Sequence, residues 1–234
     1  MTTPAPISLL EGLATTRAIR RFRPDPIPDA DLATILWHAT RGPSGSNRQP
    51  TRFLVLRDGL GAVAAKGILA RSFRELWRQK RAEDGYDGGS GAVADSPKAR
   101  MAQTMDRFVD RFEATPVVVL ACYRRHREPH PTEGASVYPS CQNLLLAARA
   151  LGYGGVLTIW HGLVEPELRV ALGIPDDVAI AATIALGRPE GHHGPVRRRP
   201  LRDVVFDGAW GESAPWATDP DGTRFTAAGP PRAG

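Results

Sequence analysis

The sequence contains little cysteine and no long apolar run. Its two cysteines, Cys122 and Cys141, have neither CxxC spacing nor the spacing of metal ligands, so we expect a reducing cytoplasm and no disulfide framework. No apolar stretch approaches the roughly 20 residues that span a bilayer, so we expect no membrane segment. Residues 1–6 carry no basic cluster and lead into no long apolar run, so we expect no signal peptide.

Common nucleotide-binding, nucleophile and metal motifs are also missing. The chain has no P-loop and no G-x-G-x-x-G after a predicted strand. The loop around Ser44 is not a nucleophile elbow, because Ser46 stands where G-x-S-x-G has its second glycine. His192 and His193 share a glycine-rich loop without a carboxylate or cysteine at ligand spacing, so we expect no metal site. The sequence identifies no catalytic residue.

The charge is moderately basic, with 30 Lys and Arg against 25 Asp and Glu and a net charge of +5. The basic residues are neither concentrated in a recognition helix nor interleaved with aromatics, and no zinc-finger or RNP-type motif occurs, so we expect no nucleic-acid partner. Because arginine dominates and suits bidentate phosphate binding, the composition favours a site for small phosphorylated anions.

Hydrophobic patterning predicts one α+β domain over residues 1–234, with no repeat and no dividing linker. Apolar residues at helical spacing predict helices over 7–17, 30–39 (with Asp29 as N-cap), 61–81, 101–112, 137–151 and 165–172. Short apolar runs predict buried strands over 53–56, 117–123 and 178–186. The periodicity does not give the strand order.

Two segments are rich in glycine and other residues that do not form a core. Residues 83–97 combine glycine and aspartate, which predicts a mobile loop. The tail, about 207–234, is dense in proline and glycine and cannot form a core of its own. Because Trp210, Trp216 and Phe225 are large apolar groups in such a segment, we expect the tail to lie on another surface.

Two arginine-containing segments are candidates for anion binding. Arg17 and Arg20 lie three residues apart after a helix, so their guanidinium groups can point the same way and clamp a phosphate. Arg198 lies in a later basic run that could return to the same clamp. The alternative for both segments is solvated charge, which at a helix end is favoured by the helix dipole.

Two further segments complete the candidate site. The loop over 42–50 offers the hydroxyl and amide groups of Ser44, Ser46, Asn47 and Gln49, which suit hydrogen bonding to a flat heterocycle such as an isoalloxazine ring. The alternative is an ordinary turn, since these are turn residues.

An apolar helix over 137–151 runs into Gly152, Gly154 and Gly155, where a backbone could approach a ligand closely. The alternative is a glycine C-cap and turn. The helix is apolar almost all round, so it must be buried in a core or between subunits.

Taken in order, these segments resemble the FMN-dependent nitroreductase superfamily. The resemblance rests on TRAIRRF at 16–22, PSGSNRQP at 43–50, QNLLLAARALGYGG at 142–155, GRPEG at 187–191 and RRRPLRDVV at 197–205. It is weakest over 60–110 and beyond 210. The sequence also departs from the family pattern: Thr16 and Ala18 stand where that pattern has arginine and serine, and Thr51 replaces a tryptophan.

The resemblance implies a central mixed sheet flanked by helices, in an intertwined homodimer with two FMN sites at the interface. Residues about 60–112 would form the variable helical section that shapes the substrate pocket. The implied FMN contacts are Arg17, Arg20 and Arg198 at the phosphate and the N1/O2 edge, Pro43, Ser44, Gly45 and Asn47 along the ring, and Gly154, Gly155 and Thr158 near N5.

The implied activity is reduction of a small-molecule electron acceptor, such as a nitroaromatic or a quinone, by ping-pong hydride transfer from NADPH or NADH. Two alternatives stay open. One is a flavin-fragmenting or dehalogenating member of the same superfamily, and the other is a flavin-binding protein without turnover.

Overall fold

The centre of the computed structural model, which describes residues 7–226, is a four-stranded antiparallel sheet. Its strands lie in the order β1 (Thr51–Leu56), β2 (Val117–Arg124), β4 (Val178–Gly187) and β3 (Gly154–Thr158). The central strands β2 and β4 are continuous apolar runs because helices cover both of their faces. The α+β fold class expected from the sequence is confirmed.

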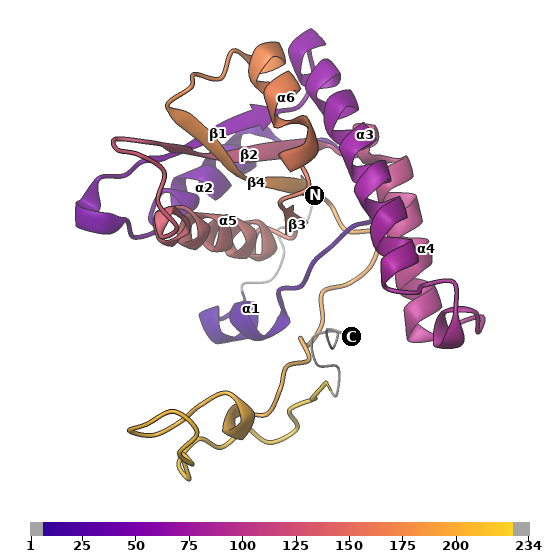
Figure 1. Ribbon diagram of the computed structural model, residues 1–234, viewed down its shortest axis with the longest axis vertical. Helices are drawn as coiled ribbons and strands as arrows, with labels where there is room; N and C mark the ends of the chain where they lie inside the picture. The colour runs from indigo at the N-terminus through magenta and orange to yellow at the C-terminus, as the bar shows by residue number, and fades with distance from the viewer. Residues whose placement is uncertain (1–6, 227–234) are drawn as a thin grey trace.

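The helices divide between the two faces of the sheet (Figure 1). Helices α2 (Asp29–Ala39) and α5 (Tyr138–Ala150) pack against Val117, Val119 and Ala121 of β2. Helices α3 (Leu60–Glu83), α4 (Pro97–Asp110) and α6 (Glu165–Leu172) pack on the side of Val118 and Leu120. The alternation along β2 follows the two-residue period of a strand and produces two separate cores. A short helix, α1 (Leu9–Thr15), precedes them and contacts α5.

Several predicted element ends move in the structure. Asp29 is the first residue of α2 rather than its N-cap; Pro28 precedes it, and no side chain caps the helix. Helix α4 begins at Pro97, four residues earlier than expected, because Ser96 caps it: the Ala99 amide donates to Ser96 Oγ at 3.0 Å. Proline is favoured at the first helical position, where its missing N–H has no partner in any case.

Strand β3 is the element that sequence patterning missed. Residues 154–158 begin with two glycines after a helix, which read as a turn rather than a strand. The glycines are there because neighbours approach closely: a Cβ on Gly155 would lie 2.6 Å from the Ala185 carbonyl oxygen. A Cβ on Gly154 would lie 2.7 Å from Ile19 Cγ1.

The sheet differs in detail from the expected mixed sheet. All three strand pairings are antiparallel, and one parallel bridge, between Ala18 and Gly155, adds to the edge of the sheet. This bridge places the segment after α1 along the free edge of β3. In the part of the chain that the structure describes, no helix is long and apolar enough to cross a membrane.

The segment over 83–97, expected as a mobile loop, is tied to the helices that it joins. Arg81 forms ion pairs of 2.7 Å with both Asp87 and Asp106, and Lys98 Nζ donates to the Asp84 carbonyl at 2.8 Å. A 3-10 turn at Gly89–Gly91 forms its tip. The two helices and this turn project from the sheet as one hairpin (Figure 1).

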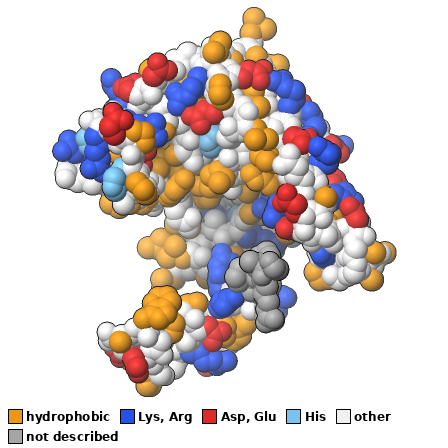
Figure 2. All heavy atoms as spheres, in the orientation of Figure 1, with side chains coloured by type: hydrophobic (Ala, Val, Ile, Leu, Met, Phe, Trp, Pro, Cys, Tyr) orange, Lys and Arg blue, Asp and Glu red, His pale blue; other side chains and the backbone are white. Residues whose placement is uncertain are grey.

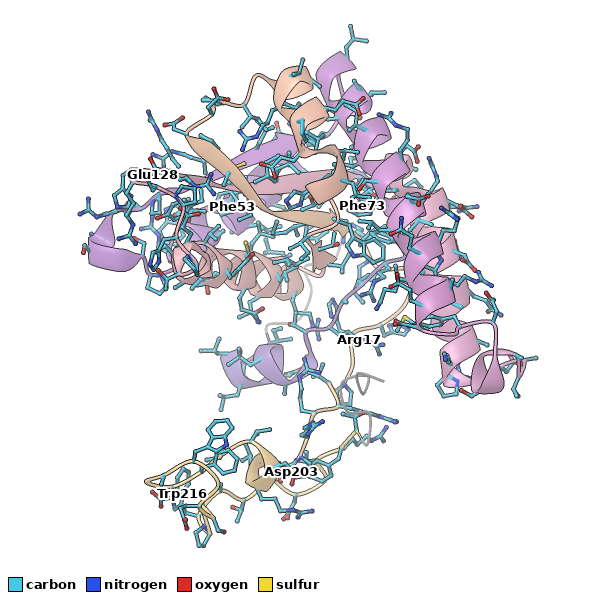
Figure 3. All side chains as sticks on the ribbon, viewed as in Figure 1. Arg17, Phe53, Phe73, Glu128, Asp203 and Trp216 are labelled. Carbon is cyan, nitrogen blue, oxygen red and sulfur yellow. The ribbon has the colours of Figure 1, made fainter. Side chains whose placement is uncertain are left out.

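Residues 201–226 are named here the arm, which includes 207–226 of the expected tail; the rest of that tail, 227–234, lies outside the described residues. The arm extends away from the sheet and folds back on itself (Figures 1 and 3). Phe206 bridges to Ser213, and Trp216 Nε1 donates to Asp207 Oδ2 at 2.8 Å. Trp210 remains 91% exposed, so the arm presents an uncovered aromatic surface.

Candidate functional site

A cavity of about 850 Å³ lies where the segment after α1, strand β3, the first turn of α4 and residues 195–198 meet. Arg17, Arg20, Gly155 and Arg198 all line it, so four of the predicted site residues come together. We call it the arginine cavity. Figure 2 shows basic side chains in the hollow between the sheet and the arm, and Figure 3 shows Arg17 beside α4.

The backbone that carries Arg17 and Arg20 is fixed by strand β3. The Ile19 amide donates to the Gly155 carbonyl at 2.9 Å, and the Ile19 side chain is buried against Gly154. This strand-like pairing turns the residues on either side of Ile19 away from the core. The glycines of β3 therefore do two things: they admit Ile19 and leave open backbone at the cavity wall.

The arginine cavity is strongly electropositive. Its basic lining consists of Arg17, Arg20, Arg100, Arg197 and Arg198, and none of the described lining residues carries a carboxylate. Burial, and then the neighbouring charge of Arg17, lower the pKa of Arg20 below its usual range. A desolvated guanidinium without an acidic partner is costly, and a bound anion would offset that cost.

One residue of the cavity lining has an unsatisfied hydroxyl. Thr16 lines the cavity, and its Oγ1 is buried without a hydrogen-bond partner among the described residues. Buried hydroxyls are normally hydrogen-bonded, so this one is free to bond to a ligand. Arginine donors together with a free hydroxyl fit a phosphate-bearing cofactor such as FMN.

The loop over 42–50, called here the polar loop, lies away from the arginine cavity. Pro43, Ser44 and Gly45 line a separate cavity of about 460 Å³, together with Tyr123 and Ser136. The Gly45 amide donates to Ser136 Oγ at 3.0 Å, which holds the loop against the turn before α5. Within one subunit this loop therefore does not share the arginine cavity.

The polar loop is conformationally strained. Ser46, Asn47 and Gln49 have φ values of 51°, 51° and 50°, in the left-handed region that non-glycine residues rarely adopt. Each such residue costs on the order of 1 kcal/mol or more, and such strain clusters at ligand clamps. Because Gln49 Nε2 donates to Asn47 Oδ1 at 3.2 Å, the loop holds its amides in one arrangement.

Two further predicted residues do not line the arginine cavity. Gly154 packs against Ile19 and Pro189, and Thr158 Oγ1 accepts from the Trp160 amide at 3.2 Å at the end of β3. Sequence reasoning missed Arg100 and Met101 of α4, which do line it. They lie in the section that resembled the family least.

Two other lining residues belong to a motif that is visible in the sequence. Gln142 and Leu145 also line the cavity, and both belong to the QNLLLAA motif, which was interpreted as a helix only. Arg197 lies next to the predicted Arg198 and shares the same wall.

The thiols offer no nucleophile. Burial raises the pKa of Cys122 to about 11 and that of Cys141 to about 12. Both cysteines are free and buried, so they stay protonated at neutral pH and act as small core residues. Among residues 7–226, no group of three or more His, Cys, Asp or Glu side chains could hold a metal ion.

An uncovered apolar face lies on α1, α2 and α5. Leu10 is 76% exposed and Trp37 is 57% exposed. Between these helices a groove of about 370 Å³ is lined mainly by apolar groups, including Leu9, Leu146 and Ala147. Apolar patches of this kind on a globular protein mark contact surfaces.

Comparison with known proteins assigns the chain to a family. Residues 13–188 match the family model of the nitroreductase family. The NADH dehydrogenase of Thermus thermophilus is 32% identical over 81% of this chain and 91% of its own. The 5,6-dimethylbenzimidazole synthase of Rhodospirillum rubrum is 28% identical over 76% of this chain and 80% of its own. The crystal structure of an FMN- and NADPH-dependent nitroreductase from Sphigopyxis sp. has a TM-score of 0.64 at 23% identity, over 85% of this chain and 98% of that one. The chain belongs to the nitroreductase family.

Proposed function

We propose that the protein is an FMN-dependent oxidoreductase that uses NAD(P)H to reduce electron-poor acceptors such as nitroaromatics or quinones. The observation that carries the proposal is the arginine cavity, where several unpaired arginines and the free Thr16 hydroxyl meet the open backbone of Gly155. An oxidoreductase of the nitroreductase family is the established part; the cofactor and the reductant are the proposal.

The residues of the cavity have distinct roles in this proposal. Arg17, Arg198 and the Thr16 hydroxyl hold the phosphate. The family pattern has an arginine and a serine where this chain has Thr16 and Ala18, so here Arg17, Arg198 and Thr16 make the phosphate contacts. Arg20 lies toward the N1/O2 edge of the ring, where a positive charge stabilises the anionic reduced flavin. Gly155 admits the ring to the β3 backbone. When bound, FMN supplies the hydride chemistry, and the chain supplies binding, orientation and charge.

We further propose that the site is completed by a second copy of the chain. Pro43, Ser44, Gly45 and Asn47 would then line the flavin bound to the partner, while Gly154 and Thr158 shape the β3 end of the ring site. Two observations support this: the polar loop and the arginine cavity are separate within one subunit, and an apolar face is left uncovered on α1, α2 and α5. The exposed Trp210 fits an arm that reaches across to the partner.

The variable section over 60–112 shapes the acceptor pocket in this proposal, because the first turn of α4 places Arg100 and Met101 on the cavity wall. We also propose a cytoplasmic location, since both cysteines are free thiols.

A second candidate is the flavin-fragmenting chemistry that the resemblance left open. The 28% identity to a synthase of the same family, close to the 32% identity to the Thermus NADH dehydrogenase, is the observation that favours it. Exposing the reduced, flavin-loaded protein to air and analysing the flavin by mass spectrometry separates the two. Intact FMN supports the reductase, and loss of FMN to a fragment supports the alternative.

The test of the main proposal starts from the purified protein. We expect a yellow protein whose released cofactor co-elutes with FMN, and whose NADPH or NADH oxidation depends on an added nitroaromatic or quinone. A protein that binds FAD or haem, or that binds no flavin after reconstitution, contradicts the proposal. Bound FMN without reduction by either nucleotide would instead indicate a flavin-binding protein without turnover.

A further inference from the structure

The arginine cavity continues into a second lobe, part of whose lining has no role in the proposed flavin site. This lobe has a volume of about 400 Å³ and shares Arg20, Arg100 and Met101 with the arginine cavity, so the two adjoin. Arg21 and His192 line the second lobe but not the arginine cavity. Ligand pockets typically measure about 300–1,000 Å³, so each lobe has room for its own ligand.

The two lobes together carry more positive charge than a flavin phosphate requires. Their arginines are Arg17, Arg20, Arg21, Arg100, Arg197 and Arg198. A phosphate monoester carries a charge of about −1.5 to −2 at neutral pH, which two arginines balance. The remaining arginines are left without a counter-charge, because none of the described residues lining either lobe is acidic.

None of these six arginines forms an ion pair with another described residue, and Arg100 donates only to the Asp95 carbonyl oxygen. Two arginines of the neighbouring helices are paired: Arg71 lies 2.6 Å from Glu167, and Arg107 lies 2.8 Å from Glu190. The chain therefore supplies acids around α3 and α4 but keeps them out of the lobes.

The second lobe also has an apolar side. Met101 and Ile19 line it together with the arginines, so the lobe combines apolar and basic lining residues. Such a pocket suits a flat aromatic body with one acidic substituent, because the ring contacts Met101 while the acid makes charge-assisted hydrogen bonds to arginine.

We propose that the second lobe binds the carboxylate of an aromatic electron acceptor, with Arg21 and Arg100 as the residues that select it. The inference rests on the proposed function and specifies the acceptor class. For a nitroaromatic acid, NAD(P)H supplies a hydride and the medium a proton; the nitro group is reduced to nitroso with release of water, and the nucleotide leaves as NAD(P)+. The carboxylate is unchanged and serves to position the ring.

The test compares two acceptors of nearly the same shape, 4-nitrobenzoate and 4-nitrobenzamide, on the flavin-loaded enzyme. We expect kcat/KM to favour the acid. In Arg21→Gln the value for the acid falls by about tenfold or more, the loss of one charge-assisted hydrogen bond, while the value for the amide is unchanged. In Arg100→Gln, which also changes the lining of the arginine cavity, the value for the acid falls more than the value for the amide. The matched control is Arg23→Gln, an exposed arginine that lines neither lobe.

Equilibrium dialysis of each compound against the oxidised enzyme measures binding without turnover, and we expect the acid to bind more tightly. If acid and amide bind equally while FMN is in place, the proposal for the second lobe is overturned and the proposed function is not. The same follows if kcat/KM in the variants falls equally for both acceptors. A loss confined to NADPH, with NADH and both acceptors unaffected, assigns the arginines to the nucleotide phosphate and overturns the proposal. A protein that holds no FMN overturns this inference together with the proposed function.

Discussion

Replacing Arg20 by glutamine separates the binding role of this residue from a structural one. In the structure its guanidinium is largely buried, and it has no acidic partner among the described residues. Burial and the adjacent Arg17 lower its pKa, because both disfavour the charged form when no anion is bound. Removing the charge therefore relieves an unfavourable interaction when no ligand is bound, and removes a favourable one when an anion is present.

The two effects have opposite signs. Loss of a hydrogen bond to a charged group costs about 1.5–3 kcal/mol, so we expect FMN affinity to fall by roughly tenfold to 150-fold in Arg20→Gln. The flavin-free protein should be at least as stable as the wild type, because the desolvated charge is gone. A residue that served only to hold the fold would give the reverse pattern, with lower stability and unchanged affinity.

The assay is paired. Flavin fluorescence titration of the flavin-free protein gives the FMN dissociation constant, and urea denaturation of the same sample gives the free energy of unfolding. Arg23→Gln, an exposed change three residues away, is the control and should alter neither. Unchanged FMN affinity in Arg20→Gln would refute the assignment of Arg20 to the flavin site.

Three further predictions test other parts of the account. His161 is buried, and burial lowers its pKa below the ordinary 6.5. The stability that the neutral side chain contributes is therefore fully present above pH 6.5 and is lost as the pH falls through the lowered folded pKa. The free energy of unfolding should fall with pH over this range, and the His161→Asn variant should flatten that slope. Gly155→Ala places a Cβ 2.6 Å from the Ala185 carbonyl oxygen and should cost about 1–3 kcal/mol in chemical denaturation, whereas Gly61→Ala, with open space around its Cβ, should not destabilise; equal effects would contradict the close approach. Truncation after Phe206 removes both exposed tryptophans of the arm and should weaken the dimer in light scattering, and an unchanged dimer would show that the arm does not cross to the partner.

The elements that could be predicted from the sequence are those whose residues face a core on a regular period. The run of apolar residues in β2 gives a strand whatever surrounds it, and the glycine after Leu172 ends α6 by adopting a left-handed conformation. Strand β3 could not be predicted, because its glycines satisfy a steric condition set by Ile19 and Ala185, which are far away in the sequence. The start of α4 depended on a single cap, Ser96, within a glycine-rich context.

The candidate site also contains residues that could be predicted from the sequence and residues that could not. Arg17, Arg20 and Arg198 were predicted from local motifs, and the structure places them on one cavity. Motif order alone could not show that the polar loop lies elsewhere in the subunit, because separation in space follows from the path of the chain. Arg100 was missed because its contribution depends on where the α3–α4 hairpin projects, and no local pattern encodes that direction.

The central claim, that the arginine cavity is a phosphate-anchored flavin site, is tested most directly by calorimetric titration of the flavin-free protein with FMN and with riboflavin. The two ligands share the ring and the ribityl chain and differ only in the phosphate. The account predicts one FMN per chain and, because the phosphate forms charge-assisted hydrogen bonds of about 1.5–3 kcal/mol each, an affinity for FMN at least about tenfold above that for riboflavin. Equal affinity for the two, or no binding of either, would contradict it.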